Sequence, residues 1–182
     1  MIQGKKCSDV MTKDLICCLP EDTVDMAAQS MKRIDIGSLP VVDSPKTKKL
    51  VGIVTDRDLA LNVVAEGRDP RQTRIEGVMA RNLVTCGLQD DLQLALDAMS
   101  QSQLRRIPVV DEQGRLAGII TQADIATRLE QPEATGKVVE QISRSKRTVG
   151  FDVAWDEPRS VSRFSRPWNN CSSGGLVQGN GQ

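Results

Sequence analysis

Apolar residues recur at helical spacing near the start of the chain. Val24, Ala27, Ala28 and Met31 lie at positions i, i+3, i+4 and i+7, the spacing of one face of an α-helix. Asp22 precedes this stripe, and a short acidic side chain at that place is typical of a helix cap. The pattern therefore predicts a helix that begins near Asp22 and packs this face against a core.

Short apolar runs flank this helix and predict strands. One run lies at 15–18, before the helix, and two lie at 39–42 and 50–54, after it. The polar segment between the last two runs predicts a hairpin of two buried strands. A second helix is expected from about 56 to 65, so this stretch is predicted to be β-α-β-β-α.

The same pattern occurs a second time. At an offset of 68 residues, Val10-Met11 matches Val78-Met79, and Pro40-Val41-Val42-Asp43 matches Pro108-Val109-Val110-Asp111. After the polar hairpin turn, which is longer in the first copy, the offset falls to 66, and Thr55 and Asp58 match Thr121 and Asp124. The predicted elements of the second copy are a helical stripe at Leu92, Ala95, Leu96 and Met99, strands at 107–110 and 116–120, and a helix from about 122 to 130.

Two packed copies are the predicted fold. One unit of about 60 residues buries too little apolar surface to be secure alone, whereas two units can share a core. We predict an α/β (α+β) protein in which copy one, residues 7–66, and copy two, residues 74–132, pack as a pseudo-twofold pair. A closing helix is expected over 133–144, followed by a disordered tail over 145–182.

The tail holds all the aromatic residues of the chain, which are Phe151, Trp155, Phe164 and Trp168. They are spaced among arginines, as in a docking segment for a protein partner. A non-functional extension is the alternative, and both interpretations stay open. The core of residues 1–150 must be built from aliphatic side chains.

Composition excludes several classes of function. The chain has no histidine, which removes the commonest general base and most zinc sites. Its formal net charge is zero, so no bulk attraction to nucleic acid or an anionic membrane is expected. No apolar run is long enough to cross a bilayer, and no P-loop or secretion signal is present. We expect a cytoplasmic protein that is not an enzyme and holds no metal.

Five cysteines, an odd number without a Cys-x-x-Cys pair, argue against a disulfide framework. Cys18 and Cys86 occupy matched positions in the two copies, so a pseudo-dyad would bring them together as a redox pair. The simpler interpretation is that both are small buried residues of strands.

The tetrad Thr-x-x-Asp stands in each copy where a strand ends and a helix begins. Free backbone N–H groups and partial positive charge at a helix start suit a phosphate. The Thr55 hydroxyl could donate to a phosphate or ribose oxygen, and the Asp58 carboxylate could accept from ribose hydroxyls. The tetrad is also close to a capping box, which is the simpler interpretation of these residues alone.

The wider pattern resembles the CBS motif. The residues that carry the resemblance are Val-Met-Thr at 10–12, Gly-Ser-Leu-Pro-Val-Val-Asp at 37–43 and Val-Gly-Ile-Val-Thr-Asp-Arg-Asp-Leu at 51–59, with counterparts at 78–79, 105–111 and 117–125. The resemblance implies a CBS pair, or Bateman module, that commonly dimerises. It also implies binding of an adenosyl ligand, such as AMP, ADP, ATP or S-adenosylmethionine, in clefts between the motifs, with no obligatory cofactor.

Ten residues are the candidate nucleotide contacts. They are Ile16, Leu39, Thr55, Arg57 and Asp58, with Val84, Arg106, Ile107, Thr121 and Asp124. The two clefts are not equivalent, because Arg57, which would contact phosphate, is matched by Ala123. Arg105 and Arg106 would compensate in copy two, unless they are only solvated or paired with carboxylates.

The function predicted from these features is that of a regulatory module. It would bind an adenine nucleotide, form a homodimer and transmit the binding event to a protein partner. The alternative is a structural or dimerisation module with empty clefts.

Overall fold

The computed structural model describes residues 4–128 together with residues 136 and 140. All of them belong to one unit of the chain, Met1–Lys146. The predicted closing helix over 133–144, except residues 136 and 140, and the predicted disordered tail over 145–182 lie outside the described residues. So do the last two residues of the helix expected over 122–130.

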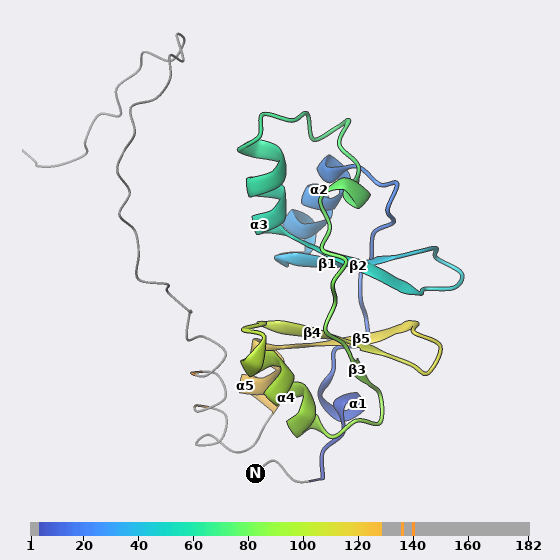
Figure 1. Cartoon of the computed structure of the whole chain (residues 1–182), viewed down its shortest axis with the longest axis vertical. Coiled ribbons are helices and arrows are strands. Elements are labelled where there is room, and N and C mark those ends of the chain that lie inside the picture. Colours follow the sequence, from blue (N-terminus) through green and yellow to red (C-terminus); the bar gives the residue numbers. More distant parts are fainter. Residues whose placement is uncertain (1–3, 129–135, 137–139, 141–182) are drawn as a thin grey trace, which may run out of the picture. The chain divides into compact units, whose positions relative to one another are not determined.

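Each copy contributes a β-hairpin flanked by helices (Figure 1). The first half of the chain forms α1 (Cys7–Val10), α2 (Val24–Ile34), β1 (Ser38–Val42), β2 (Leu50–Thr55), α3 (Asp56–Leu59) and the π-helical turn η1 (Ala60–Val64). The second half forms the 3-10 turn η2 (Ile75–Gly77), β3 (Cys86–Gly87), α4 (Leu92–Gln101), β4 (Arg106–Val110), β5 (Leu116–Thr121) and α5 (Gln122–Arg128). The predicted mixed α and β class is confirmed.

Both predicted hairpins are present and match each other in register. β1 pairs antiparallel with β2, and β4 pairs antiparallel with β5, with irregularities at the matched steps Val41/Val42 and Val109/Val110. The two hairpins lie between the outer helices in Figure 1, and their turn regions are joined by backbone hydrogen bonds. Leu50 N donates to Gly114 O at 3.1 Å, and Leu116 N donates to Lys48 O at 2.8 Å.

Two local predictions about copy one are wrong. The helix cap is Thr23, whose side chain accepts from Met26 N at 3.3 Å. Asp22 instead accepts from Leu19 N at 2.7 Å, in the turn before the helix. Ala28 is exposed, because the hairpin covers only the side of α2 that carries Val24, Ala27 and Met31.

The strand predicted at 15–18 is reduced to one bridge. Cys18 alone pairs with Val41, in parallel orientation. Leu15 and Ile16 do not join the ladder, because they turn toward a cleft described below. The helix predicted over 56–65 is present, but its second half has π geometry, with Ala65 N donating to Ala60 O at 2.9 Å.

The two copies exchange their leading segments. α1 and Met11 belong to the core of copy two, whose other members are Cys86, Leu92, Ala95, Leu96, Met99, Ile107, Val109, Ile120 and Ile125. The segment 75–79 belongs to the core of copy one in the same way. Cys7 N donates to Asp90 O at 3.0 Å, and Ile75 N donates to Asp22 O at 2.9 Å. The segment that precedes copy one therefore completes the core of copy two, and the segment that precedes copy two completes the core of copy one.

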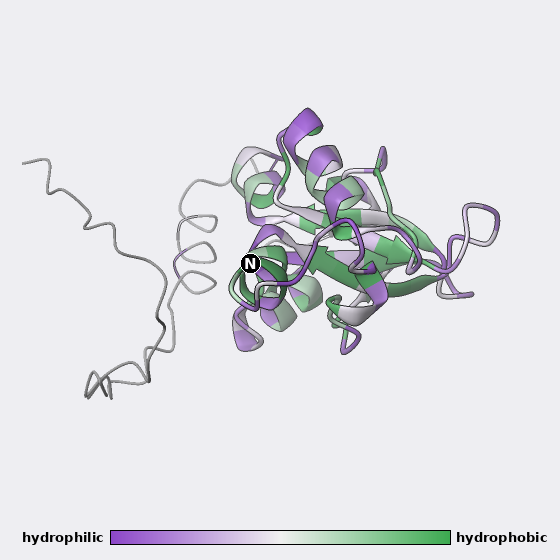
Figure 2. Cartoon of the chain, turned by 90° about the horizontal axis from the view of Figure 1, so that it is seen from above, coloured by the Kyte–Doolittle hydropathy of each residue, from purple (hydrophilic) through white to green (hydrophobic). Residues whose placement is uncertain are grey.

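Hydrophobic residues concentrate in the strands and on the inner sides of the helices, while polar residues lie on the outer helix surfaces (Figure 2). Cys18 and Cys86, 5% and 6% exposed, lie in different cores, so they do not pair, and the simpler interpretation of both as small buried residues is confirmed. Cys86 lies beside Cys7 instead, and its hydrogen bond with the Cys7 sulfur, followed by burial, raises the pKa of Cys86. A thiol held protonated in this way is a poor nucleophile.

A methionine covers a strand glycine at each exchanged segment. A Cβ added to Gly118 would lie 2.5 Å from Met11 Sδ and 2.9 Å from the Thr12 carbonyl oxygen. A Cβ added to Gly52 would lie 2.5 Å from Met79 Sδ and 3.2 Å from the Ala80 carbonyl oxygen. Only glycine lets the exchanged segments approach the strands this closely.

We predict that Gly118→Ala lowers the free energy of unfolding by about 1–3 kcal/mol, the usual cost of overpacking a core. The methionine side chain can move, but the Thr12 carbonyl is held by Ile119 N at 3.0 Å. Urea unfolding measures the loss. Gly136→Ala is the control, because its added Cβ meets nothing within 4 Å. Equal unfolding midpoints for the two variants would contradict the packing described for Gly118.

Candidate functional site

Thr55 and Asp58 form a capping box at the start of α3. Asp58 N donates to Thr55 Oγ1 at 3.2 Å, and Thr55 N donates to Asp58 Oδ2 at 2.9 Å. The Thr55 hydroxyl also donates to Asp58 Oδ2, at 2.6 Å. Thr121 and Asp124 make the same three contacts in copy two, at 3.1, 2.9 and 2.6 Å. The capping interpretation is confirmed in both copies.

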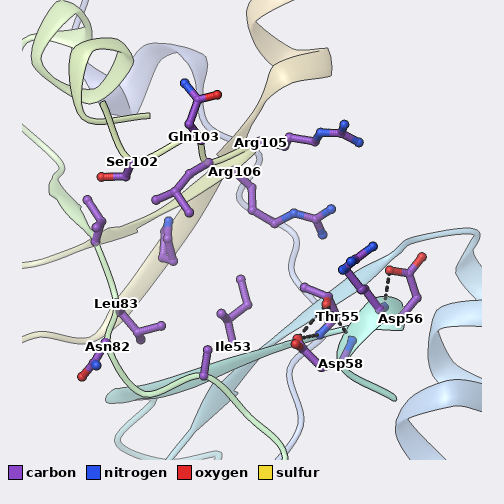
Figure 3. Close-up of a pocket in the computed structure, with 15 residues that line it drawn as sticks. Ile53, Thr55, Asp56, Asp58, Asn82, Leu83, Ser102, Gln103, Arg105 and Arg106 are labelled. Carbon is purple, nitrogen blue, oxygen red and sulfur yellow. Dashed lines mark hydrogen bonds between the residues drawn. The ribbon is translucent and has the colours of Figure 1, made fainter. Parts of the chain in front are cut away.

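The same tetrad lines a cleft between the copies, which we call the Thr55 cleft. Its cavity volume is about 720 Å³. Copy one supplies the end of β2 and the start of α3, and copy two supplies the segments 80–84 and 102–106 with Pro108. The capping role therefore coexists with a position at a cleft wall (Figure 3).

Three guanidinium groups line the Thr55 cleft: Arg57, Arg105 and Arg106. In the part of the chain that the structure describes, none of them forms an ion pair with a carboxylate. Arg106 extends across the cleft toward Thr55 (Figure 3). Burial lowers the pKa of Arg106 from its ordinary value, and the Asp56 carboxylate opposes this effect. The guanidinium stays charged at neutral pH, so the cleft holds cationic groups with free hydrogen-bond donors.

A second cleft, the Thr121 cleft, has a cavity volume of about 630 Å³. Copy two supplies Thr121, Ala123 and Asp124, and copy one supplies residues 12–16 and 34–38 with Pro40. Arg106 borders this cleft as well. Each cleft thus combines the tetrad of one copy with two loop segments of the other.

The two aspartates of the tetrads differ in what else they contact. Asp124 Oδ1 accepts from the Thr12 hydroxyl at 2.9 Å and forms an ion pair with Arg128 at 3.4 Å. Arg128 also donates to the carbonyl oxygens of Val10 and Met11, at 2.8 and 2.9 Å. Among the described residues, no donor to Asp58 Oδ1 is found, because Ala80 stands where Thr12 stands in the other cleft. Asp58 is therefore the carboxylate with an oxygen open to a ligand.

Eight of the ten predicted contacts line a cleft. Thr55, Arg57, Asp58, Val84 and Arg106 line the Thr55 cleft, and Ile16, Thr121 and Asp124 line the Thr121 cleft. Leu39 and Ile107, 1% and 0% exposed, belong to the two cores and line neither cleft. Their side chains point into the cores, so they cannot contact a ligand in either cleft.

The two arginines at the start of β4 both line the cleft at the tetrad of the other copy. Arg105 lines only the Thr55 cleft, and Arg106 borders both clefts. The compensation expected for the Thr121 site is therefore replaced by a cluster around Thr55. Sequence reasoning also missed Asn82 and Gln103, which line the Thr55 cleft. No sequence signal pointed to them, because their repeat counterparts Asp14 and Asp35 were not predicted as contacts either.

No cluster of three or more potential metal ligands occurs in residues 4–128, 136 and 140. Within the same residues, no helix is both long and apolar enough to span a bilayer.

Two copies of one domain model match this chain. The model of the CBS domain matches residues 7–65 and again residues 75–131. The CBS domain-containing protein YhcV of Bacillus subtilis (strain 168) is 38% identical over 135 residues, which cover 74% of this chain and 93% of that protein. The inosine-5'-monophosphate dehydrogenase of Methanocaldococcus jannaschii is 37% identical over 131 residues, which cover 71% of this chain but 25% of the enzyme.

Solved structures of CBS proteins share the fold. Hypoxic Response Protein I, solved with two coordinated zinc ions, superposes with a TM-score of 0.62 at 34% identity, covering 69% of this chain and 99% of that one. The CBS domain pair of protein MJ0100, solved with 5-methylthioadenosine and S-adenosyl-L-methionine, gives a TM-score of 0.59 at 30% identity, covering 67% of this chain and 93% of that one. Both family matches fall on the two copies that frame the clefts, and the chain belongs to the CBS domain family.

Proposed function

We propose that this CBS pair is a regulatory module that binds an adenine nucleotide in the Thr55 cleft and passes the binding event to a partner. One observation carries the proposal. The cleft brings three guanidinium groups without carboxylate partners, Arg57, Arg105 and Arg106, to the same space as the open oxygen of Asp58. These are the groups that recognise phosphate and a ribose diol.

Each part of a nucleotide has a matching wall in this cleft. The Asp58 carboxylate suits the ribose hydroxyls, and the arginines suit phosphate oxygens because guanidinium donors form a fork. Ile53, Leu83 and Val84 offer an apolar surface for the adenine ring. No aromatic side chain is present in residues 1–150 to stack on the base. We therefore expect a dissociation constant on the order of micromolar, about −8 kcal/mol.

The comparisons support the ligand class without identifying the ligand. The MJ0100 domain pair, 30% identical to this chain, was solved with two adenosyl compounds. The dehydrogenase shares only the CBS portion with this chain, and the similarity supports regulation rather than that enzyme's chemistry. A purely structural module with empty clefts is the competing function, and it predicts no response to any nucleotide.

We also propose that the module forms a homodimer through the exposed faces of α2 and α4. Met26 and Leu94 occupy matched positions on these helices and are 54% and 63% exposed. Large exposed apolar side chains at equivalent places on two helices suit a self-complementary contact between copies of this chain.

We predict that Asp58→Asn weakens ADP binding by roughly tenfold, because it removes charge-assisted hydrogen bonds worth about 1–3 kcal/mol. Asparagine keeps an acceptor for the Thr55 backbone N–H, so the helix cap survives. Isothermal titration calorimetry with the full chain measures the change. Glu66→Gln removes the same charge from an exposed site outside both clefts and serves as the control. Unchanged affinity in Asp58→Asn would exclude the ribose contact, and no binding by the unaltered protein would favour the structural module.

The dimer proposal has a separate test. Replacing Met26 and Leu94 together by glutamate puts charge on the contact, so the double variant should sediment as a monomer at concentrations where the unaltered chain is dimeric. Gln113→Glu adds charge at an exposed position of the turn between β4 and β5, outside both helices, and should leave the dimer intact. A double variant that remains dimeric would place the interface elsewhere, and a monomeric unaltered chain would refute the dimer.

A further inference from the structure

The two clefts are built from matched positions of the repeat. Every residue that lines the Thr55 cleft, apart from Asp56, has its repeat counterpart in the lining of the Thr121 cleft. The backbone framework is thus the same, and the clefts can be compared one position at a time. Differences between them must come from the side chains.

Three positions carry a cation in the Thr55 cleft and none in the other. Arg57 is matched by Ala123, while Arg105 and Arg106 are matched by Gly37 and Ser38. Arg106 also borders the Thr121 cleft, but Figure 3 shows its side chain extending toward Thr55.

Two further positions carry an anion in the Thr121 cleft and a neutral side chain in the other. Asp14 is matched by Asn82, and Asp35 is matched by Gln103. Asp56 is the one exception, because it adds a carboxylate to the Thr55 cleft and its counterpart Gln122 is outside the lining of the Thr121 cleft. The lining of the Thr55 cleft thus contains three arginines and two carboxylates, whereas the lining of the Thr121 cleft contains one arginine and three carboxylates.

We infer that the two clefts take different classes of adenosyl compound. The Thr55 cleft takes a nucleotide with two or more phosphates, and the Thr121 cleft takes an adenosyl compound whose 5′ substituent is neutral or cationic. The inference rests on the proposed function, because it specifies the ligands of the proposed clefts. Three guanidinium groups bring more positive charge than the about −2 of a single phosphate group can balance, whereas carboxylates repel any phosphate.

The contacts of Asp124 agree with this assignment. Its second oxygen is already held by Thr12 and Arg128, so a ribose must displace the Thr12 hydroxyl to reach it. Asp14 and Asp35 are exposed, and their attraction for a cation is screened by water and salt. The Thr121 cleft is therefore the weaker site, and its preference depends on ionic strength.

The test titrates the full chain with ADP, with AMP and with S-adenosylmethionine, by calorimetry at low salt. ADP should bind at least about tenfold more tightly than AMP, as expected for an added charge-assisted contact. S-adenosylmethionine, which carries a sulfonium cation, should bind with the same affinity whether or not the protein is saturated with ADP. Independent binding of the two ligands places them in different clefts.

Variants taken from the repeat itself assign the clefts. Arg57→Ala installs the residue found at 123 and should weaken ADP about tenfold while leaving S-adenosylmethionine unchanged. The double variant Asp14→Asn with Asp35→Gln installs the residues found at 82 and 103, and should weaken S-adenosylmethionine about threefold while leaving ADP unchanged. Asp35 and Gln103 share a left-handed backbone, with φ of 54° and 53°, so this exchange adds no strain.

The outcomes separate this inference from the proposed function. Competition between ADP and S-adenosylmethionine, or an equal loss of both ligands in either variant, would overturn the division by charge while leaving nucleotide binding intact. ADP binding no tighter than AMP binding would overturn the polyphosphate assignment. A failure of all three compounds to bind would instead refute the proposed function. Thermal unfolding midpoints within about 2 °C of the unaltered chain establish that each variant is folded.

Discussion

The exchange of leading segments is the constraint on which the rest of the structure depends. α1 is buried in the core of copy two, and the segment 75–79 is buried in the core of copy one. Neither copy can close its core without the chain that precedes the other. This interlock brings residues 80–84 and 12–16 past the ends of β2 and β5, which is what creates a cleft at each tetrad.

The two clefts share the same backbone framework and differ in the charge of their side chains. The hairpins keep the same register, and the two capping boxes have nearly identical distances. Substitutions at the cleft lining cost the fold little, because side chains such as Arg57 and Asp35 are exposed and carry no core packing. The repeated framework therefore presents two equivalent clefts whose exposed lining positions can differ in chemistry at little cost to the fold.

The sequence predicted what is local and periodic. The hairpins and both tetrads follow from apolar runs and from Thr-x-x-Asp at fixed spacing, and the structure has them where they were expected. The exchange was not predicted, because the apolar residues at 7–11 carry no sign of which core they enter. Arg105 was assigned to the wrong cleft for the same reason: its neighbours in space come from the other copy. The side chains of Leu39 and Ile107 line no cleft because both faces of their strands are covered.

The contact of Asp124 with Thr12 and Arg128 links the Thr121 cleft to the N-terminal segment, and the Thr55 cleft has no equivalent contact among the described residues. Arg128 ties the end of α5 to the carbonyl groups of Val10 and Met11, directly beside the glycine contact of Gly118. A ribose that takes the place of the Thr12 hydroxyl would compete with these contacts. Part of the binding free energy would then go into loosening the N-terminal segment. Filling the Thr55 cleft requires no such displacement. A ligand in the Thr121 cleft would therefore act directly on the segment that interlocks the two copies.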